Sequence, residues 1–422
     1  MTVSLSRCSY TQLPSVMLSL SASASEIYAQ LALPASKSES NRTLIIQGLS
    51  EGPIALHNLS SARDTRIMQR LLDSEGHVLD AADAGTTMRF LTAYFAAVQR
   101  DQILTGTPRM CKRPIGILVD ALRHLGAEIE YWKQDGFPPL HIVSKGRQRL
   151  IGGELTMEGH VSSQFISAIL MIAPTLPGGL QLHLSGELTS RPYVEMTRSL
   201  MARFGVTTNW EAQTLHIPEQ PYQAGEYTIE SDWSAASYWY SFAALADEAD
   251  IRLRGLREAS LQGDQAIARL MAPFGVATTY EADGVRLTKT QPQTDAQTID
   301  FTAFPDLAQT MAVVAAATGT PLRMTGLHTL RIKETDRIEA LAQELGKFGV
   351  QVRTEADACE IGGGFDPKPA MIHTYDDHRV AMAFAPLVLR TQHLSLQDGT
   401  VVEKSYPEFW QHVAQAGIQV SG

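Results

Sequence analysis

The segments MARFGVTT (residues 201–208) and MAPFGVATT (residues 271–279) decide the fold, because they are two copies of one pattern. In each, an amphipathic helical stretch ends at a glycine and a β-branched strand follows. Glycine at this position supplies the left-handed backbone conformation that ends many helices. The pattern recurs along the chain, so six glycines are predicted to end helices: Gly76, Gly126, Gly205, Gly275, Gly349 and Gly417.

A short apolar strand that breaks at a turn residue precedes each of these glycines. From turn residue to glycine the separations are 18, 20, 19, 20, 23 and 18 residues; the turn residues are Asn58, Gly106, Gly186, Gly255, Gly326 and Gly399. Such small scatter predicts six copies of one unit of about 70 residues in which strands and helices alternate. Six units divide naturally into two domains of three. The alternative is ordinary α/β alternation with coincident glycines. The Ala-rich segments 162–174 and 306–319 are expected to be buried helices between the strands.

Composition limits the classes of function. A chain of 422 residues with 44% hydrophobic and 19% charged residues is globular and long enough for two or three domains. A net charge of −10 argues against a nucleic-acid or anionic-membrane partner, yet leaves room for a small anionic ligand. Cys8, Cys111 and Cys359 form no CxxC motif, so we expect neither disulfides nor a zinc site, and a cytoplasmic location. The Ser-rich residues 1–25 are expected to be an extension leading into the first strand, with a targeting peptide as the alternative.

Four arginines stand near the predicted start of helices, where a cation is unfavourable. Arg42, Arg89, Arg337 and Arg379 each follow Ser, Thr, Asn or Asp in an N-cap position. A helix N-terminus carries about half a positive charge, so a cation there costs a few tenths of a kcal/mol. Free helix N–H groups beside an arginine make a phosphate or carboxylate site. Four such arginines therefore predict an anionic ligand.

Two carboxylates are placed for proton transfer. Asp306 follows Pro305 at the start of a helix, and Glu334 lies in RIKETDR (residues 331–337). On its own such a charged run is typical of a solvent-facing turn, here the end of a strand and the start of a helix. The chain has no Walker motif, HExxH or GxSxG, and its histidines show no metal-ligand spacing.

The charged motifs, taken in order, resemble the 5-enolpyruvylshikimate-3-phosphate synthase family. The resemblance runs from about residue 30 to about residue 412 and is carried by LPASKSESNR, DAGTTMRF, LTGTPRMCKRPIG, VSSQF, SRPY, the Asp306 segment, RIKETDR, YDDHRVAM and EKSYPEF. It implies an α/β fold, a two-domain inside-out α/β barrel of six βαβαββ units, three in each domain. The chain would cross between domains near residues 34–37 and 230–238. One domain would comprise residues 1–34 plus 231–422, the other residues 35–230, with the active site in the cleft between them.

The resemblance also implies an activity. Members transfer the enolpyruvyl group of phosphoenolpyruvate to the 5-hydroxyl of shikimate 3-phosphate and release phosphate, through a tetrahedral intermediate, in aromatic amino acid biosynthesis. The herbicide glyphosate occupies their phosphoenolpyruvate site, and Gly85 is expected to leave room for it. We therefore expect a cytoplasmic, monomeric transferase that acts on small anions, with no cofactor, no metal, no nucleic acid and no membrane.

Site residues follow from the resemblance, motif by motif. Asp306 would take the hydroxyl proton, Glu334 would protonate the methylene carbon, and Lys37 would touch both substrates. An acid at neutral pH needs a raised pKa, which burial of Glu334 would favour and its charged neighbours would oppose. The implied contacts to shikimate 3-phosphate are Lys37, Ser38, Arg42, Ser162, Ser163, Gln164, Ser190, Tyr193, Asp306, Thr329 and Lys333. Those to phosphoenolpyruvate are Lys37, Gly85, Arg109, Gln164, Arg337, Arg379 and Lys404.

Five positions depart from the family pattern without removing a catalytic group. They are Asp83 for a frequent Asn, Phe90 for Pro, Thr329 for Asn, Ala35 for Gly and Arg191 for Lys. These departures leave substrate affinity and glyphosate sensitivity open.

Three other functions remain as alternatives. The sister transferase that acts on UDP-N-acetylglucosamine uses a loop cysteine as its acid, and Cys111 lies in a comparable region, although RIKETDR is typical of the shikimate type. An RNA-end-processing enzyme would need a basic stripe that this chain lacks. A non-catalytic anion-binding scaffold would need neither Asp306 nor Glu334.

Overall fold

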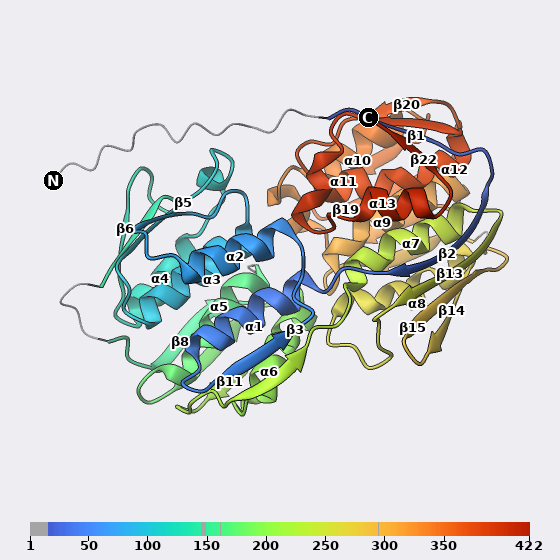
Figure 1. The fold of residues 1–422 in the computed structure, drawn as a ribbon. Helices are drawn as coiled ribbons and strands as arrows, with labels where there is room; N and C mark the ends of the chain where they lie inside the picture. The colour runs from blue at the N-terminus through green and yellow to red at the C-terminus, as the bar shows by residue number, and fades with distance from the viewer. Residues whose placement is uncertain (1–15, 145–148, 161, 294) are drawn as a thin grey trace.

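The computed structural model describes residues 16–144, 149–160, 162–293 and 295–422, which form two lobes joined side by side (Figure 1). Buried apolar side chains between residues 44 and 222 form one hydrophobic cluster, and we call this part the central lobe. A second cluster combines residues 18–33 with residues 233–418, and we call this part the terminal lobe. The expected extension at residues 1–15, with Cys8, lies outside the described residues.

The central lobe contains three sheets and the helices that cover them. Its elements are α1 (Lys37–Leu49), β3 (Ile54–His57), α2 (Arg63–Asp73), β4 (Val78–Asp80), α3 (Gly85–Ala97), β5 (Gln102–Thr105), η1 (Met110–Lys112), α4 (Gly116–His124), β6 (Glu128–Tyr131), β7 (Leu140–Val143), β8 (Gly153–Glu158), α5 (Ser163–Ile172), η2 (Ala173–Thr175), β9 (Leu180–Ser185), α6 (Arg191–Arg203), β10 (Asn209–Glu211), β11 (Thr214–Ile217) and β12 (Gly225–Thr228).

The terminal lobe contains the other three sheets. Its elements are β1 (Leu18–Ser21), β2 (Glu26–Ala32), α7 (Trp233–Leu245), β13 (Glu248–Arg254), η3 (Gly263–Ala266), α8 (Ile267–Leu270), η4 (Ala272–Phe274), β14 (Val276–Glu281), β15 (Gly284–Lys289), β16 (Gln297–Asp300), η5 (Pro305–Leu307), α9 (Ala308–Thr318), β17 (Leu322–Thr325), η6 (His328–Ile332), α10 (Arg337–Gly346), β18 (Val352–Thr354), β19 (Ala358–Ile361), β20 (Ala370–Ile372), α11 (His378–Phe384), η7 (Ala385–Leu387), α12 (Val388–Thr391), β21 (His393–Leu396), η8 (Thr400–Lys404), α13 (Phe409–Gln415) and β22 (Gln419–Ser421).

The sheets repeat one topology, which confirms the predicted repeat of strands and helices. In the sheet β8-β9-β11-β10, strands β8 and β9 pair in parallel. Strands β10 and β11 form an antiparallel hairpin, and β11 pairs antiparallel with β9. The order is the same in β4-β5-β7-β6, β16-β17-β19-β18, β2-β13-β15-β14 and β20-β21-β1-β22. Each is the strand pattern of a βαβαββ unit. Among the described residues the remaining unit keeps only the parallel pair β12-β3.

The glycine pattern is confirmed at most of its positions. Five of the six predicted helix-ending glycines have the left-handed φ: Gly126, Gly205, Gly275, Gly349 and Gly417. The prediction for Gly76 is wrong, because α2 already ends at Asp73 with Ser74 as an extended C-cap. Of the turn residues, Asn58, Gly186, Gly255 and Gly326 have positive φ, whereas Gly106 and Gly399 do not. The predicted buried helices are α5 and α9, whose residues are buried almost throughout.

Two short segments lie side by side where the chain passes between the lobes. Strand β2 is the last strand of the terminal lobe before the chain enters the central lobe, and it pairs with β13, whereas β12 is the last strand of the central lobe and pairs with β3. Directly after these strands, Ala35 forms an isolated bridge with Ser231, and the Ser36 amide donates to the carbonyl of Glu230 at 2.8 Å. Figure 1 shows the blue N-terminal strand β1 beside the red strands of the terminal lobe. No helix in the described part of the chain is long and apolar enough to cross a bilayer.

Candidate active site

Arg337 organises two carboxylates at the edge of the terminal lobe. Its guanidinium lies 3.2 Å from Asp306 and 3.1 Å from Glu334, and a third carboxylate, Asp377, accepts from its Nε at 2.7 Å. The arginine is 2% exposed. The charged run that contains it is therefore no solvated turn, although part of the prediction for it was wrong: a 3₁₀ helix, η6, and not a strand, precedes α10.

Local capping explains how an arginine can begin α10. The carboxylate of Asp336 accepts from the backbone amides of Ile338 and Glu339, both at 3.1 Å, as an N-cap residue does. Asp377 is the N-cap of α11 and also accepts from the amide of Arg379 at 2.9 Å. Carboxylates thus offset the cost of a cation at both helix N-termini.

Asp306 is held ionised by the cations around it. Arg379 lies 2.7 Å from its carboxylate, and Lys333 lies 4.0 Å away. Burial alone would raise the pKa of Asp306, but Arg379, Lys333, Arg337 and Lys37 outweigh it and lower that pKa. The carboxylate is therefore ionised in the free protein.

A second aspartate beside Asp306 was not predicted from the sequence. The hydroxyl of Tyr193 in the central lobe lies 3.4 Å from Asp306 and 3.5 Å from Asp264. Burial, with the nearby charge of Asp306, raises the pKa of Asp264 to about 7. Asp264 therefore carries a proton part of the time at neutral pH, whereas Asp306 is ionised. The segment LQGDQAIA around Asp264 carries no motif, so the sequence offered no signal for it.

Glu334 is ionised in the free protein, whereas a general acid must carry a proton. Its Oε1 lies 3.4 Å from Lys404 and 3.7 Å from Arg113 of the central lobe. Burial would raise the pKa of Glu334, but Lys404, Arg113 and Arg337 prevail and hold that pKa well below its usual range. The expectation of a balanced or raised pKa is therefore wrong for this arrangement of charges.

His378 is a buried neutral imidazole among these charges. It is 2% exposed, and neither ring nitrogen has a hydrogen-bond partner in the described structure. Burial, together with Lys37, Arg379 and Lys404, holds the pKa of His378 well below its usual range. The residue lies inside YDDHRVAM, so the motif contained it although sequence reasoning assigned it no role.

The N-terminus of α3 in the central lobe forms a cationic cradle. A Cβ built on Gly85 would lie 2.6 Å from Arg89 Nη1 and 2.7 Å from Arg113 Nη1, so both guanidinium groups close over this residue. No side chain caps the helix, because Ala84 stands at the N-cap position. Burial and the neighbouring Arg113 lower the pKa of Arg89 to about 9. Two buried like charges at uncapped helix amides make a strong anion site.

Gln164 extends the cradle from α5. It accepts from Arg89 at 3.1 Å and donates to Thr86 at 3.1 Å. Ser162 is the N-cap of α5 and accepts from the Gln164 amide, with Ser163 following it in the first turn. The VSSQF motif thus lies beside the α3 N-terminus.

Helix α1 places Lys37 in the site, whereas its Arg42 donates hydrogen bonds to other groups of the central lobe. Lys37 Nζ lies 3.2 Å from Asp64. Arg42 donates to Thr197, Ser167 and the carbonyl of Ser38, at 2.7–3.2 Å. The prediction that Arg42 and Arg89 occupy first turns is wrong, because each lies in the second turn of its helix.

Arg42 is packed between two aromatic rings. Its guanidinium lies 5.4 Å from the ring centroid of Phe90 and 5.8 Å from that of Tyr193. Burial lowers the pKa of Arg42 to about 10.

Three contacts close the lobes over the charged centre. Lys404 of the terminal lobe forms an ion pair of 2.7 Å with Asp83 of the central lobe, and Arg63 pairs with the other oxygen of Asp83 at 2.7 Å. Arg109 is exposed and donates to the backbone carbonyls of Glu334 and Lys333, at 3.0 and 2.8 Å. The amide of Ser190 donates to the Thr302 carbonyl at 2.8 Å.

Thr329 has no recorded contact with this group in the described structure. It belongs to η6, and its hydroxyl is buried without a hydrogen-bond partner in the described structure. Of the predicted residues, Lys37, Gly85, Gln164, Tyr193, Asp306, Lys333, Glu334, Arg337, Arg379 and Lys404 gather around the charged centre, whereas Arg109 and Ser190 lie at the lobe contact.

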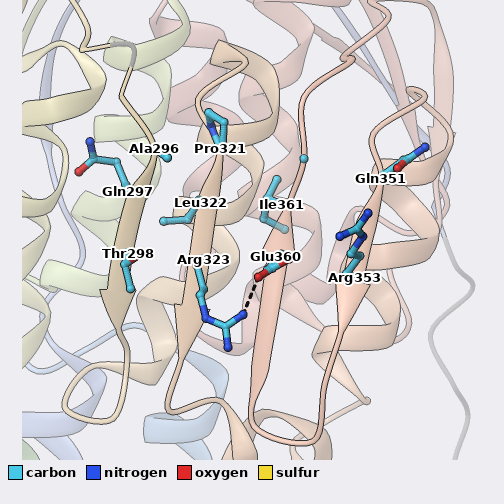
Figure 2. A pocket seen from close by; sticks show the side chains of 11 residues that line it. Ala296, Gln297, Thr298, Pro321, Leu322, Arg323, Gln351, Arg353, Glu360 and Ile361 are labelled. Atoms are coloured by element: carbon cyan, nitrogen blue, oxygen red, sulfur yellow. Dashed lines mark hydrogen bonds and ion pairs between the residues drawn. The ribbon is translucent and has the colours of Figure 1, made fainter.

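A cavity elsewhere on the molecule does not share this chemistry. It measures about 340 Å³ and lies over the sheet β16-β17-β19-β18, where Figure 2 shows Arg323 paired with Glu360. That ion pair measures 2.5 Å and leaves both groups about 40% exposed. The cavity holds none of the predicted site residues, so the charged centre between the lobes is the better candidate.

The chain is similar to proteins of one enzyme family. The family model described as EPSP synthase (3-phosphoshikimate 1-carboxyvinyltransferase) matches residues 69–413. The 3-phosphoshikimate 1-carboxyvinyltransferase of Bacteroides fragilis is 48% identical over 94% of this chain and 97% of that protein. The one from Methanosphaerula palustris is 37% identical over 91% and 96%. An EPSP synthase structure from Acinetobacter baumannii superposes with a TM-score of 0.77 and 21% identity, covering 96% of this chain and all of that one, so the two share the two-domain α/β fold. The chain thus belongs to the EPSP synthase family.

Proposed function

We propose that this protein transfers the enolpyruvyl group of phosphoenolpyruvate to the 5-hydroxyl of shikimate 3-phosphate and releases phosphate. The observation that carries the proposal is the pairing of Asp306 and Glu334 through Arg337, within a ring of buried cations from both lobes. Two polyanionic substrates need such a ring, and addition of a hydroxyl across a double bond needs two proton-transfer groups.

Asp306 and Glu334 divide the proton transfers between them. In the addition step, the 5-hydroxyl oxygen bonds to the central carbon of phosphoenolpyruvate and its proton passes to Asp306. Glu334 gives a proton to the methylene carbon, which becomes a methyl group in a tetrahedral intermediate. In the elimination step a methyl proton returns to Glu334, the carbon–oxygen bond to phosphate breaks and phosphate leaves. The proton that Asp306 took from the hydroxyl passes to the departing phosphate, which restores the carboxylate for the next turnover.

The substrates themselves supply the condition under which Glu334 can act as an acid. Lys404, Arg113 and Arg337 keep the pKa of Glu334 low in the free protein. Phosphate and carboxylate groups that pair with these cations add negative charge beside Glu334. Its pKa then rises, because nearby anions favour the protonated carboxyl. Glu334 thus gains its proton as the substrates bind.

The phosphoenolpyruvate contacts divide between the lobes, and Arg113 replaces Arg109 among them. Arg113 is 8% exposed, lies over Gly85 and faces Glu334 at 3.7 Å, whereas Arg109 is exposed and clamps backbone carbonyls. The other contacts that we propose for phosphoenolpyruvate are Lys37, Gly85, Arg89, Gln164, Arg337, Arg379 and Lys404. Their placement supports one anion site with helix amides on one side and cations on the other.

Shikimate 3-phosphate lies against the opposite side of the same centre. Lys37, Lys333, Tyr193 and Asp306 surround that side. Ser38, Ser162, Ser163, Ser190 and Thr329 supply further polar groups. Arg42 supports this surface from behind, because its contacts hold Ser38, Thr197 and the Tyr193 ring in place.

We also propose two domains, residues 1–34 plus 231–422 and residues 35–230, that close on the substrates. The separate hydrophobic clusters and the bridge between Ala35 and Ser231 support this division. Closure would keep water away from the reactive intermediate. A monomeric state and a cytoplasmic location remain predictions, which size-exclusion chromatography and cell fractionation would test.

The geometry does not favour the sister reaction on UDP-N-acetylglucosamine. The thiol of Cys111 donates to the carbonyl of Gly106 in its own loop at 3.6 Å and has no recorded contact with Glu334 or Arg337. A cysteine acid would have to face the methylene carbon that Glu334 serves here.

Phosphate release from phosphoenolpyruvate tests the proposal. The purified protein is assayed with shikimate 3-phosphate, with UDP-N-acetylglucosamine and with no acceptor. We expect release only with shikimate 3-phosphate. Equal release without an acceptor, or release with the UDP-sugar alone, would contradict the proposal.

A further inference from the structure

The sheet β4-β5-β7-β6 brings four metal-binding side chains together at its solvent-facing end. His77 directly precedes β4, and its carbonyl accepts from the amide of Ile103 in β5 at 2.8 Å. Ile103 pairs with His141 in β7, and His141 pairs with Glu130 in β6. Asp101 directly precedes β5. The strand register therefore fixes all four positions relative to one another.

Three of these side chains present ligand atoms to a common point. Asp101 Oδ1 lies 3.1 Å from His141 Nε2 and 3.6 Å from His77 Nδ1, and the three ligand atoms lie within 4.8 Å of one another. The amide of Ser144 donates to the other oxygen, Oδ2, at 3.3 Å, which leaves Oδ1 turned toward both imidazoles. An oriented carboxylate between two imidazoles is a donor set that zinc accepts.

Glu130 provides an independent observation that distinguishes this cluster from a surface ion pair. Its Oε2 lies 3.4 Å from His141 Nδ1, on the opposite edge of the ring from Asp101. A carboxylate that accepts from one ring nitrogen leaves the other free to bind a metal, and metal-bound histidines almost always have such a partner. The ring of Trp132 also packs edge-on against His141 at 6.1 Å, which limits its rotation.

We propose that His77, Asp101 and His141 form a binding site for a divalent transition metal of the zinc class, oriented by Glu130. Two nitrogens and one carboxylate oxygen suit Zn²⁺, Ni²⁺ or Cu²⁺ better than Mg²⁺ or Ca²⁺, which prefer oxygen ligands. Water completes the coordination, because the cluster faces solvent. When the metal binds His141 Nε2, the neutral ring carries its proton on Nδ1, where Glu130 accepts it.

The metal has a structural role at this position. Strand β4 leads from His77 toward Asp83 and Gly85, and β5 leads from Asp101 toward Arg113. The cluster therefore lies at the opposite ends of these strands from the anion site. A bound metal ties β4, β5 and β7 together without touching the substrates, so we expect it to raise thermal stability and leave turnover unchanged.

Zinc affinity of the full-length protein without a histidine tag tests the proposal, measured by competition with a chromophoric chelator. We expect one Zn²⁺ per chain, with His141→Gln and His77→Gln each lowering affinity by about 10–100-fold, and Glu130→Gln lowering it within the same range. His57→Gln is the matched control, because His57 pairs with Glu226 across strands at 3.6 Å, and no third metal-binding side chain joins the pair among the residues that the structure describes. It should bind Zn²⁺ as the wild type does.

Two further measurements distinguish loss of the metal site from misfolding and from binding of Zn²⁺ to a cysteine. His77 is about half exposed, so His77→Gln should fold normally and should abolish only the rise in melting temperature that Zn²⁺ causes. The absorption spectrum with Co²⁺ should show nitrogen and oxygen ligation. Equal Zn²⁺ affinity of the wild type, His77→Gln and His141→Gln, or a thiolate spectrum from a cysteine site, would overturn the proposal.

Discussion

At the scale of single residues, the site is built around carboxylates held ionised by buried cations. Asp306 and Glu334 both have lowered pKa values although each is buried, because the cations that surround them outweigh desolvation. A buried charge of this kind is stable only while its partners remain. In the free protein, its own carboxylates thus neutralise the buried cations. Substrate anions later compete with these carboxylates for the same cations.

Replacement of Glu334 by Gln tests its proton-transfer role. Gln keeps the size and polarity of the side chain but cannot carry the proton to the methylene carbon. We expect turnover to fall by at least about 100-fold while substrate binding is largely kept. Steady-state kinetics and equilibrium binding of shikimate 3-phosphate measure the two effects.

Glu339→Gln is the matched control for this substitution. Glu339 lies in the first turn of the same helix, α10, but its side chain is exposed and accepts from Gln343. Its variant should turn over as the wild type does. A near-normal rate for Glu334→Gln would remove Glu334 from its proposed role.

Asp83 competes with the substrate for Lys404. Its carboxylate lies 2.7 Å from the Lys404 ammonium, and burial, which alone would raise the pKa of Asp83, is outweighed by Lys404 and Arg63, which lower it. Asn at this position keeps the shape but loses the charge. We therefore expect Asp83→Asn to lower the KM for phosphoenolpyruvate and the inhibition constant for glyphosate by roughly tenfold each.

The exposed Asp120 in α4 of the same lobe provides the control for charge removal. Asp120→Asn changes net charge equally but lies away from Lys404. Both constants should stay at wild-type values. If Asp83→Asn weakened phosphoenolpyruvate binding instead, the carboxylate would be part of the binding surface and not a competitor.

At the scale of elements, helix N-termini form part of the anion site. The sequence predicted that these helices exist better than it predicted the residues at which they begin and end. The repeated glycines located the six units because a left-handed helix end has a local sequence signal. The prediction for Gly76 failed because helix α2 ends before it, with Ser74 as a C-cap in an extended conformation. Arg89 and Arg42 lie a turn deeper than predicted, because N-cap signals leave a helix start uncertain by several residues.

Residues that depend on packing between the lobes could not be predicted. Arg109 and Arg113 stand four positions apart in one motif, and only the folded loop turns Arg113 inward and Arg109 toward backbone carbonyls. Asp264 has no motif at all and reaches Asp306 through the hydroxyl of Tyr193. The pKa direction of Glu334 likewise depends on Lys404 and Arg113, which are distant in sequence.

Gly85→Ala tests the α3 N-terminus as part of the phosphoenolpyruvate site. The new Cβ would meet the guanidinium groups of Arg89 and Arg113 at 2.6 and 2.7 Å, so both must shift. We expect the KM for phosphoenolpyruvate to rise at least about tenfold. The free energy of unfolding should change by no more than about 1 kcal/mol, because the backbone here suits alanine.

Gly346→Ala is the matched control, because a Cβ on this glycine of α10 meets nothing within 4 Å. Its kinetics should be unchanged. An unchanged KM in Gly85→Ala would mean that phosphoenolpyruvate does not lie against the α3 N-terminus.

At the scale of the whole molecule, a buried glutamate lies beside the segment where the chain leaves the central lobe, because its carboxylate accepts from the amide of Glu230 at 3.4 Å. Glu39 in α1 accepts from the hydroxyl of Tyr227 at 2.8 Å, and its other oxygen has no hydrogen-bond partner in the described structure. Burial, aided by the nearby charge of Glu230, raises the pKa of Glu39 from 4.5 to about 7. Between these values the folded protein keeps a proton that the unfolded chain releases, so stability falls as pH rises through this window.

Glu39→Gln should remove this pH dependence. From about pH 5 to about pH 8 the wild type should lose roughly 2–3 kcal/mol of unfolding free energy relative to the variant. Urea unfolding at both pH values measures the difference, and other titrating groups cancel in the comparison. The exposed Glu51→Gln serves as control and should follow the wild type; parallel pH profiles of wild type and Glu39→Gln would refute the assignment.

The central claim is that enolpyruvyl transfer proceeds through addition of a proton to the methylene carbon and its later removal. Turnover in heavy water tests this most directly, because a methyl group formed with one deuterium rotates freely before it loses a hydrogen. We predict that the product formed from phosphoenolpyruvate and shikimate 3-phosphate carries deuterium in its methylene group, as mass spectrometry or NMR would detect. Product with an unlabelled methylene group, or no transfer to shikimate 3-phosphate at all, would contradict the account.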